Sequence, residues 1–144
     1  GNSVSELNGM KNFLDKYLNE IMESNFPNLK TVAGAQVGAK LIAQAGDAER
    51  LARMPSSKVQ VLGAEKALFR HLKEGSKPPK YGIILKHQLL QSAPPRLRGK
   101  VARALAAKIS LAIRTDIYSK EFVGDKLRKD LEIKIARIKG GGKK

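Results

Sequence analysis

Between Met10 and Met22 the apolar residues recur at the spacing of one face of an α-helix. They stand at positions i, i+3, i+4, i+7, i+8, i+11 and i+12, with polar residues between them. Such a stripe is typical of a helix that pairs with another helix, as in a coiled coil. No similar helix precedes it, so we expect the partner helix to lie on another molecule or on a missing segment. Residues 1–9 are predicted to be a short lead-in. The stripe consists of Met10, Phe13, Leu14, Tyr17, Leu18, Ile21 and Met22.

The rest of the chain is divided by proline, glycine and capping residues into further helical stretches. Pro27 ends or bends the first helix, because a proline restricts the residue before it. Gly46 and Asp47 are predicted to end one helix and cap the next. Lys73–Lys80 has the composition of a loop. We find no convincing strand and no repeat, so the predicted class is all-α, with an N-terminal segment 1–26, a domain 27–139 and a disordered basic tail 140–144. The expected helices after the first cover residues 29–45, 48–54, 59–72, 94–118 and 121–139.

The positive charge is concentrated in one part of the sequence. The chain of 144 residues has a net charge of +15 and a pI of about 10.2. Residues 63–120 hold +10 of this excess, whereas residues 1–34 are net −1. Because such an excess costs self-repulsion in a compact protein, it indicates a binding face for a polyanion, either a nucleic acid or an anionic membrane surface.

The predicted helix 94–118 separates apolar residues from cations. At 100° per residue, Lys100, Arg103 and Arg114 fall within an arc of about 60°. Ala107 and Ser110 lie on the same arc, which predicts a flat face for a phosphate backbone. Arg96 and Arg98 add charge at the end where the helix dipole also favours anions. The alternative is a solvated face on which Arg114 pairs with Asp116 or a C-terminal acid. The predicted core face holds Ala102, Leu105, Ile109, Ala112 and Ile113.

The residues expected of an enzyme or a metal site are missing from the sequence. There is no cysteine, and the two histidines, His71 and His87, are predicted to be surface or hydrogen-bonded residues. The segment 34–40 resembles a phosphate-binding loop, but its glycines are one residue too close and Leu41 replaces the Ser or Thr. We therefore expect no catalysis, no cofactor and no metal. No apolar run could span a membrane and no signal peptide is visible, so we expect a cytoplasmic protein.

Aromatic residues are too few for a typical single-strand binder. They make up 5% of the chain, and only Phe69 and Tyr81 lie in the basic region. Phe69 is predicted to belong to the core. Since single-strand binders stack bases on exposed aromatic rings, this composition favours duplex or folded RNA that is recognised by its backbone and shape.

Five segments of the sequence form a set of motifs in a fixed order. They are Pro27-Asn28-Leu29 before a Gly/Ala helix, Met54-Pro55-Ser56-Ser57 before a VQVLG helix, Gly63–Arg70 (GAEKALFR), Lys77–Gly82 (KPPKYG) and Arg98–Ala106 (RGKVARALA). Together they resemble the Nop domain of the scaffold proteins of box C/D RNA-guided methylation particles, in an archaeal form. A spliceosomal pre-mRNA processing factor shares this domain. The resemblance covers about residues 10–139.

This resemblance implies an RNA-binding scaffold that recognises a kink-turn RNA together with its kink-turn-binding protein, a protein of ribosomal type. The methyl transfer would belong to fibrillarin, which is recruited through regions that this chain lacks. Residues 10–24 would be the second helix of a two-helix coiled coil, with possible self-association. Carried over by position, RNA contacts would involve Gly63, Ala64, Glu65, Lys66, Arg70, Lys73, Lys77, Lys80, Arg98, Lys100 and Arg103, to which the charge pattern adds Arg96 and Arg114.

Two alternatives remain at the level of sequence. Gly34 and Gly38, followed by a short helix and a proline, are faintly similar to a helix-hairpin-helix motif of duplex DNA-binding proteins, although the usual glycine spacing is tighter. The other alternative is a module that only dimerises, through residues 10–24.

Overall fold

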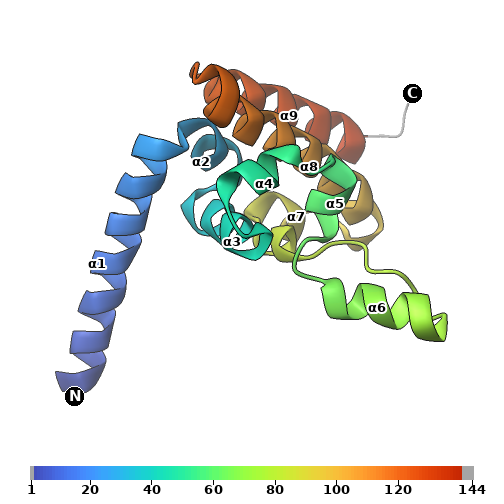
Figure 1. Cartoon of the computed structure of the whole chain (residues 1–144), viewed down its shortest axis with the longest axis horizontal. Coiled ribbons are helices and arrows are strands. Elements are labelled where there is room, and N and C mark those ends of the chain that lie inside the picture. Colours follow the sequence, from blue (N-terminus) through green and yellow to red (C-terminus); the bar gives the residue numbers. More distant parts are fainter. Residues whose placement is uncertain (1, 141–144) are drawn as a thin grey trace.

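The chain folds into helices and connecting turns throughout the part described by its computed structural model, residues 2–140 for the backbone and 6–140 for the side chains. This confirms the predicted all-α class. The elements, labelled in Figure 1, are α1 (Asn2–Asn25), α2 (Pro27–Ala33), α3 (Ala35–Ala45), α4 (Ala48–Arg53), α5 (Ser56–Val61), α6 (Glu65–Glu74), η1 (Ile83–Lys86), α7 (Gln88–Gln91), η2 (Pro95–Leu97), α8 (Arg98–Arg114), η3 (Thr115–Ser119) and α9 (Gly124–Gly140).

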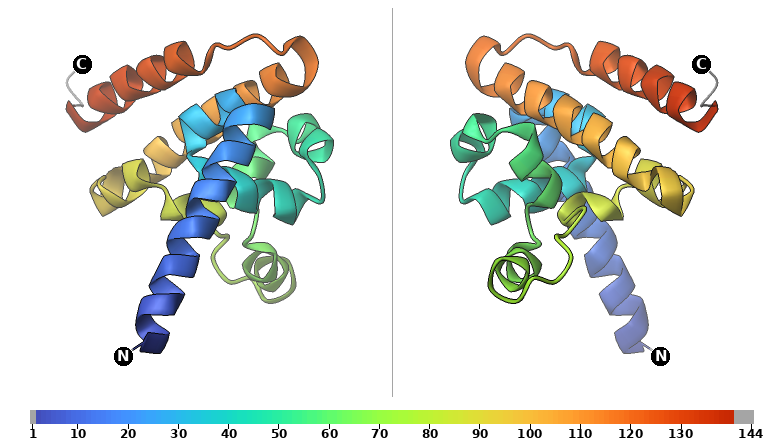
Figure 2. Two further views of the ribbon diagram at one scale, coloured as in Figure 1. Left: turned by 90° about the vertical axis from the view of Figure 1, so that its left-hand side faces the viewer. Right: turned by 90° about the vertical axis from the view of Figure 1, so that its right-hand side faces the viewer.

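Helix α8 is the centre of the core. Helices α2, α4, α5 and α9 all pack against it. The five residues predicted to form its core face are all buried, as the spacing of a 3.6-residue helix requires. Helix α9 returns antiparallel along α8, so the C-terminal end of α9 lies beside the N-terminal end of α8 (Figures 1 and 2).

Helix α1 extends away from this core as a single helix (Figure 2). Its apolar stripe is exposed over most of its length, with Phe13 67% exposed. Only at the C-terminal end does the stripe meet the body, where Met22 is 2% exposed. The predicted lead-in is wrong in its extent, since α1 already begins at Asn2.

The Gly/Ala-rich stretch is two helices and not the single helix 29–45 that we expected. Gly34 has φ +87°, a conformation that side chains rarely adopt, and it separates α2 from α3. Gly38 allows close packing, because a Cβ there would lie 2.9 Å from Cε of Met22 and 3.2 Å from Cγ of Leu29, whereas a Cβ on Gly34 would meet nothing within 4 Å. The phosphate-loop similarity of this stretch is therefore explained by close helix packing.

The expected helix 59–72 is also two helices, α5 and α6, separated at residues 62–64, where Gly63 has φ +97°. The remaining boundaries differ from the predictions by a few residues. Asp47 caps α4 as expected, since its Oδ1 accepts a hydrogen bond of 2.8 Å from the backbone N of Arg50. The predicted helix 94–118 is η2, α8 and a π-helical turn, η3. Gly140 belongs to α9, and the rest of the predicted tail lies outside the described residues. Within residues 2–140, no helix has both the length and the apolar content needed to cross a membrane.

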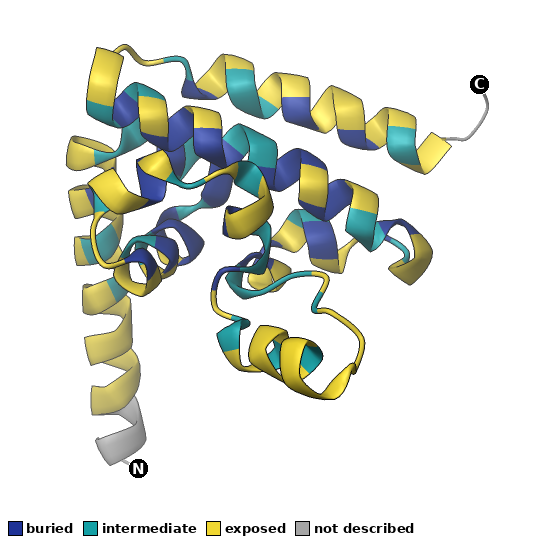
Figure 3. Cartoon of the chain, turned by 45° about the vertical axis from the view of Figure 1, so that its right-hand side comes forward, coloured by how far each residue is buried: buried dark blue, intermediate teal, exposed yellow. Residues whose placement is uncertain are grey.

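Helix α6 forms an arm that projects from the body, and none of its residues is buried (Figure 3). Backbone hydrogen bonds join the base of the arm, from Gly82 N to Gln60 O and from Ile83 N to Leu62 O. Two glycines make this junction possible. A Cβ on Gly63 would lie 2.6 Å from Cγ1 of Ile83, and one on Gly82 would lie 2.1 Å from the carbonyl oxygen of Leu62. The arm is therefore fixed at its base although it is free along its length.

Candidate nucleic-acid interface

The arm presents the GAEK segment at its junction with the body. The carboxylate of Glu65 accepts a hydrogen bond of 3.0 Å from Gly63 N and one of 3.2 Å from Nε2 of Gln44 on α3. The first bond satisfies a backbone N–H near the start of α6, where helices leave such donors unpaired. An open depression of about 620 Å³ lies here, lined by Gln44, Gly63, Ala64, Glu65, Lys66, Ala67 and Arg70.

Five predicted site residues of the arm are exposed cations. On α6, Lys66, Arg70 and Lys73 lie on one face, within about 60° of one another at 100° per residue. Lys77 and Lys80 follow in the loop that returns to the body. Within the described part of the chain, none of the five has a carboxylate within salt-bridge distance. Their charge is therefore available to an external anion.

Leu68, Phe69 and Leu72 form an exposed apolar face of α6 that adjoins the cations, with Phe69 about 40° from Lys73 around the helix, and this corrects the prediction for Phe69. This ring was expected in the core but is 62% exposed, and Leu72 beside it is 70% exposed. Leu68 completes the apolar face. Tyr81, the second aromatic residue of the basic region, packs against the core. The arm thus exposes one aromatic ring, Phe69, that could stack on a base or pack against a partner protein. The arm could therefore bind by more than contacts to the RNA backbone.

Two of the predicted RNA-binding arginines make hydrogen bonds within the protein. Nε of Arg98 donates to the carbonyls of Leu90 and Ala93, at 3.1 and 3.0 Å, at the end of α7. Nε of Arg114 donates to Ala52 O at 3.0 Å, and its Nη2 donates to Met54 O at 3.3 Å, at the end of α4. Both arginines therefore hold helix ends in place through hydrogen bonds to carbonyls. RNA binding by either arginine stays a prediction.

The alternative pairing of Arg114 with Asp116 is wrong. The carboxylate of Asp116 accepts hydrogen bonds from the backbone N of Asn28 (3.0 Å) and of Leu29 (2.9 Å), at the start of α2. Burial raises the pKa of Asp116, against the lowering effect of these hydrogen bonds. Asp116 is thus a capping residue for a helix that lies far away in sequence.

The other predicted cations of the α8 region are exposed, but the flat face that we predicted between Lys100 and Arg114 is not open along its whole length. Arg96, Lys100 and Arg103 are exposed near the start of the helix. Ser110, which was expected on the same open face, is only 3% exposed, because α4 and α5 pack against α8. Ser110, in the predicted phosphate-binding face, is therefore covered by protein, while Lys100 and Arg103 are exposed at its N-terminal end and the exposed Arg114 at its other end donates to carbonyls of the protein.

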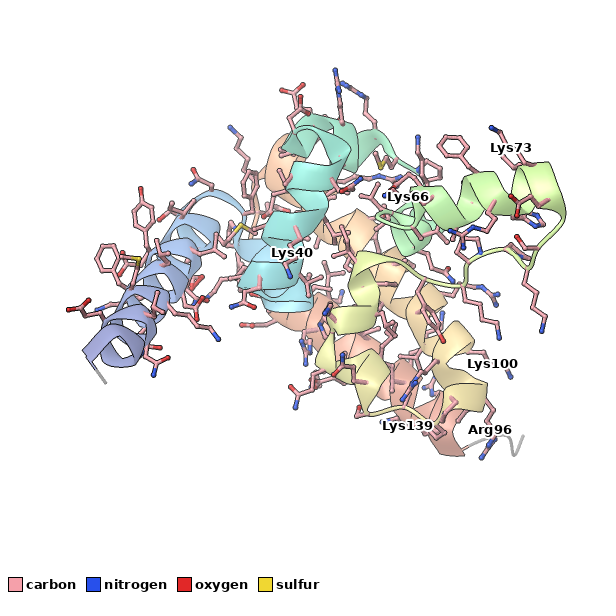
Figure 4. All side chains as sticks on the ribbon, turned by 90° about the horizontal axis from the view of Figure 1, so that it is seen from below. Lys40, Lys66, Lys73, Arg96, Lys100 and Lys139 are labelled. Atoms are coloured by element: carbon pink, nitrogen blue, oxygen red, sulfur yellow. The ribbon has the colours of Figure 1, made fainter. Side chains whose placement is uncertain are left out.

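The structure brings four of the predicted site cations to one side of the molecule. Figure 4 shows Lys66 and Lys73 on the arm and Arg96 and Lys100 at the start of α8 on the same side, with α1 on the opposite side. Figure 1 shows the same separation of α1 from α6 and the start of α8. The apolar helix α1 and the basic surface thus face different surroundings.

Each histidine has a hydrogen-bonding contact within the protein, which is one of the two roles predicted from the sequence. His87 is buried, with Nε2 3.1 Å from Val32 O and Nδ1 accepting from Leu89 N at 3.1 Å. Burial lowers the pKa of His87, the hydrogen bond to Val32 opposes this, and Arg128 adds a smaller lowering effect. Nδ1 of His71 contacts Ser76 O and joins α6 to its loop.

Sequence reasoning did not place Gln44 beside the GAEK segment, and it did not settle whether Phe69 is buried or exposed. The exposure of Phe69 had a signal in the sequence, because Leu68, Phe69 and Leu72 form an apolar face on a short segment bounded by Gly63 and Gly75. Gln44 has no comparable signal, since its position beside Glu65 depends on how α3 packs.

Comparisons with known proteins agree with these features. The chain matches the Nop family, described as "snoRNA binding domain, fibrillarin", over residues 1–137. A NOP5 family protein of Methanocaldococcus jannaschii is 45% identical over 136 residues, covering 94% of this chain and 33% of that protein. Nucleolar protein 56 of Caenorhabditis elegans is 40% identical over 141 residues, covering 96% of this chain and 29% of the relative.

A solved structure shares the fold. In the crystal structure of a fibrillarin/Nop5p complex, a chain that is 34% identical superimposes with a TM-score of 0.73, covering 94% of this chain and 50% of that one. The chain thus spans about a third of the length of these curated relatives and half of the solved one. The projecting GAEK arm, the helical core and these similarities lead to one conclusion: the chain belongs to the Nop family.

Proposed function

We propose that this chain is the RNA-binding scaffold module of a box C/D guide RNA 2′-O-methylation particle. It recognises kink-turn RNA together with the kink-turn-binding protein. The observation that carries the proposal is the α6 arm, which projects the GAEK segment and five exposed cations from the body. Membership of a family described as snoRNA-binding supports the same assignment.

The two faces of the arm suit a surface made of RNA and protein together. The cations Lys66, Arg70 and Lys73 supply attraction to phosphates, which positions a protein on RNA without reading its sequence. The apolar residues Phe69 and Leu72 are too exposed to stabilise the fold, and they suit a base or an apolar patch on the bound protein. RNA alone would satisfy the first face and leave the second incomplete.

The decisive experiment measures binding to a kink-turn RNA with and without its kink-turn-binding protein. We expect clearly tighter binding to the RNA–protein complex. Equal affinity for bare RNA would contradict recognition of a composite surface, and tighter binding to plain duplex DNA at the same salt concentration would support the helix-hairpin-helix alternative.

Variants of the arm refine this test. The double variant Lys66→Gln/Arg70→Gln should weaken binding and lower the slope of log K against log salt by about one unit for each phosphate that is no longer neutralised. Phe69→Ser should weaken binding to the complex more than binding to bare RNA. The matched control is Lys11→Gln/Lys16→Gln, which removes two exposed cations from α1 on the opposite side of the molecule.

We infer that fibrillarin is recruited through parts of the relatives that this chain does not span. The solved neighbour is a complex of fibrillarin with Nop5p, of which this chain covers half. In this proposal residues 1–26 pair with another helix and residues 27–139 bind RNA, as expected of a scaffold. A pull-down with fibrillarin should recover the full-length relative and not this chain, and recovery of this chain would place the contact here.

A further inference from the structure

The C-terminal end of α9 carries exposed cations that the concentration of charge in residues 63–120 does not include. Arg137 and Lys139 lie in the last turn of α9, and both are exposed. Because α9 runs antiparallel to α8, this turn lies beside the start of α8 (Figures 1 and 2). Figure 4 shows Lys139 at the same end of the molecule as Arg96 and Lys100.

This end of the α8–α9 pair has no carboxylate of its own. The sequence contains no Asp or Glu from Gly75 to Thr115 and none after Glu132. Among the described residues, no salt bridge involves Arg96, Lys100, Arg137 or Lys139. Bringing unpaired like charges together costs free energy, which an external polyanion would recover.

The other end of α9 is different, although it also carries cations. Lys126 and Lys129 lie in the first half of the helix, as do Asp125 and Asp130, and the loop before it contains Glu121. The charges there are mixed, and a polyanion would meet carboxylates as well as lysines. The two ends of one helix thus differ in net charge while both are exposed.

We propose that the last turn of α9, through Arg137 and Lys139, extends the RNA-binding surface at the start of α8. The phosphate backbone of one RNA lies across both helices. The inference rests on the proposed function, because it assigns a second contact to the same RNA. The proposed contact adds a part of the chain that lies outside every motif of the sequence analysis. The ligand is expected to be RNA and not an acidic protein segment, because Arg137 and Lys139 lie on the same side of the molecule as Lys100 and Arg103, which are predicted to bind RNA.

The test compares variants of this chain for binding to the kink-turn RNA with its bound protein, as a function of salt. Arg137→Gln/Lys139→Gln should lower the slope of log K against log salt by about one to two units. The matched control, Lys126→Gln/Lys129→Gln, removes the same charge about 16 Å along the same helix and should leave the slope unchanged. Both pairs of substitutions are on exposed positions, so we expect each variant to keep its helix content. Circular dichroism measures this.

The outcomes separate this proposal from the proposed function. If Lys100→Gln/Arg103→Gln lowers the slope and the last-turn variant does not, the extension is wrong and the scaffold function stands. Equal losses from both ends of α9 would mean that only overall charge matters, which overturns the extension. A loss of binding to the kink-turn protein in the absence of RNA would assign the last turn to a protein contact. If neither the unsubstituted chain nor any variant binds the complex of kink-turn RNA and its protein, the proposed function fails and the extension fails with it.

Discussion

Arg98, Arg114 and Arg128 each direct a guanidinium group at carbonyl oxygens near the end of a short helix. Arg98 does so at α7, Arg114 at α4 and Arg128 at α2, where its Nη1 lies 3.4 Å from Val32 O. Short helices leave a large share of their carbonyls without partners, and an arginine can donate to several of them at once. Part of the positive charge of this chain therefore stabilises the fold.

The two roles of the cations on α8 can be separated by measurement. Arg114→Gln should lower the free energy of unfolding by about 1–2 kcal/mol, because it removes charged donors from the end of α4. Lys100→Gln, on an exposed position, should change stability by less than about 0.5 kcal/mol and instead lower the salt slope of RNA binding. Chemical denaturation and binding at several salt concentrations provide both quantities. An unchanged stability of the Arg114 variant would show that these hydrogen bonds contribute little.

The buried His87 predicts a dependence of stability on pH. Its neutral form satisfies both ring nitrogens, whereas a proton on Nδ1 would face the N–H of Leu89. Because the pKa in the folded state lies below the ordinary value of 6.5, His87 stabilises the fold above that pH, and the contribution is lost as the pH falls below it. His87→Asn should be less stable at pH 7.5 but lose less stability between pH 7.5 and 5.5. Asp116, whose pKa is also shifted, is present in both the unsubstituted protein and the variant, so the difference between their pH profiles of stability comes from His87. Parallel profiles would contradict a role for His87 in the pH dependence.

At the scale of elements, the α6 arm is stabilised by its base and not by its own packing. None of its residues is buried, so its position depends on the junction of residues 60–64 with residues 80–83. Nε2 of Gln60 adds a hydrogen bond of 2.8 Å to Lys80 O. An arm held in this way keeps a fixed direction while both of its faces stay open to a ligand.

A substitution at the junction tests this account. Gly82→Ala would place a Cβ against the Leu62 carbonyl, so we expect a loss of about 1–3 kcal/mol in stability or a displaced arm with weakened RNA binding. The control is Gly99→Ala in α8, where nothing lies within 4 Å and alanine should be neutral or stabilising by up to about 1 kcal/mol. Denaturation and RNA binding of the two variants should differ clearly. Wild-type behaviour of the Gly82 variant would show that the junction is tolerant.

At the scale of the whole molecule, the apolar helix α1 and the basic surface lie on opposite sides. Exposing a long apolar stripe to water costs free energy, and pairing with another helix would bury the stripe. The placement allows α1 to pair with a helix while RNA occupies the other side, as a scaffold requires.

This separation predicts that helix pairing and RNA binding can be altered independently. Phe13→Ser/Tyr17→Ser removes two rings that stack on each other, at 6.4 Å between centroids, from the exposed stripe. Sedimentation at several concentrations should show weaker self-association, while the salt slope of RNA binding stays the same. The matched control is Asn12→Ser/Lys16→Ser on the polar side of α1. A protein that is monomeric at all concentrations would assign the stripe to a different partner.

How far the sequence could be read depended on the range of the interactions involved. The helices, the cap at Asp47 and the apolar face of α8 followed from spacing, because local hydrogen bonds and 3.6-residue periodicity decide them. The helix break at Gly34 escaped prediction, since a glycine in a helical pattern is compatible with either outcome. The burial of Ser110 and the exposure of Phe69 also escaped it, because both depend on which helices pack together.

The amino-acid sequence by itself determined that this chain is helical, that its first helix offers an apolar stripe and that its positive charge is unevenly distributed. Only the tertiary structure decided which cations bind within the protein, because Arg114 and Arg128 donate hydrogen bonds to carbonyls distant in sequence and Arg98 donates to carbonyls five to eight residues before it. It also decided that the GAEK segment lies where the α6 arm meets the body and that the end of α9 lies on the same side as the start of α8. Burial and proximity arise from packing between segments, and the pattern along a single chain does not contain them.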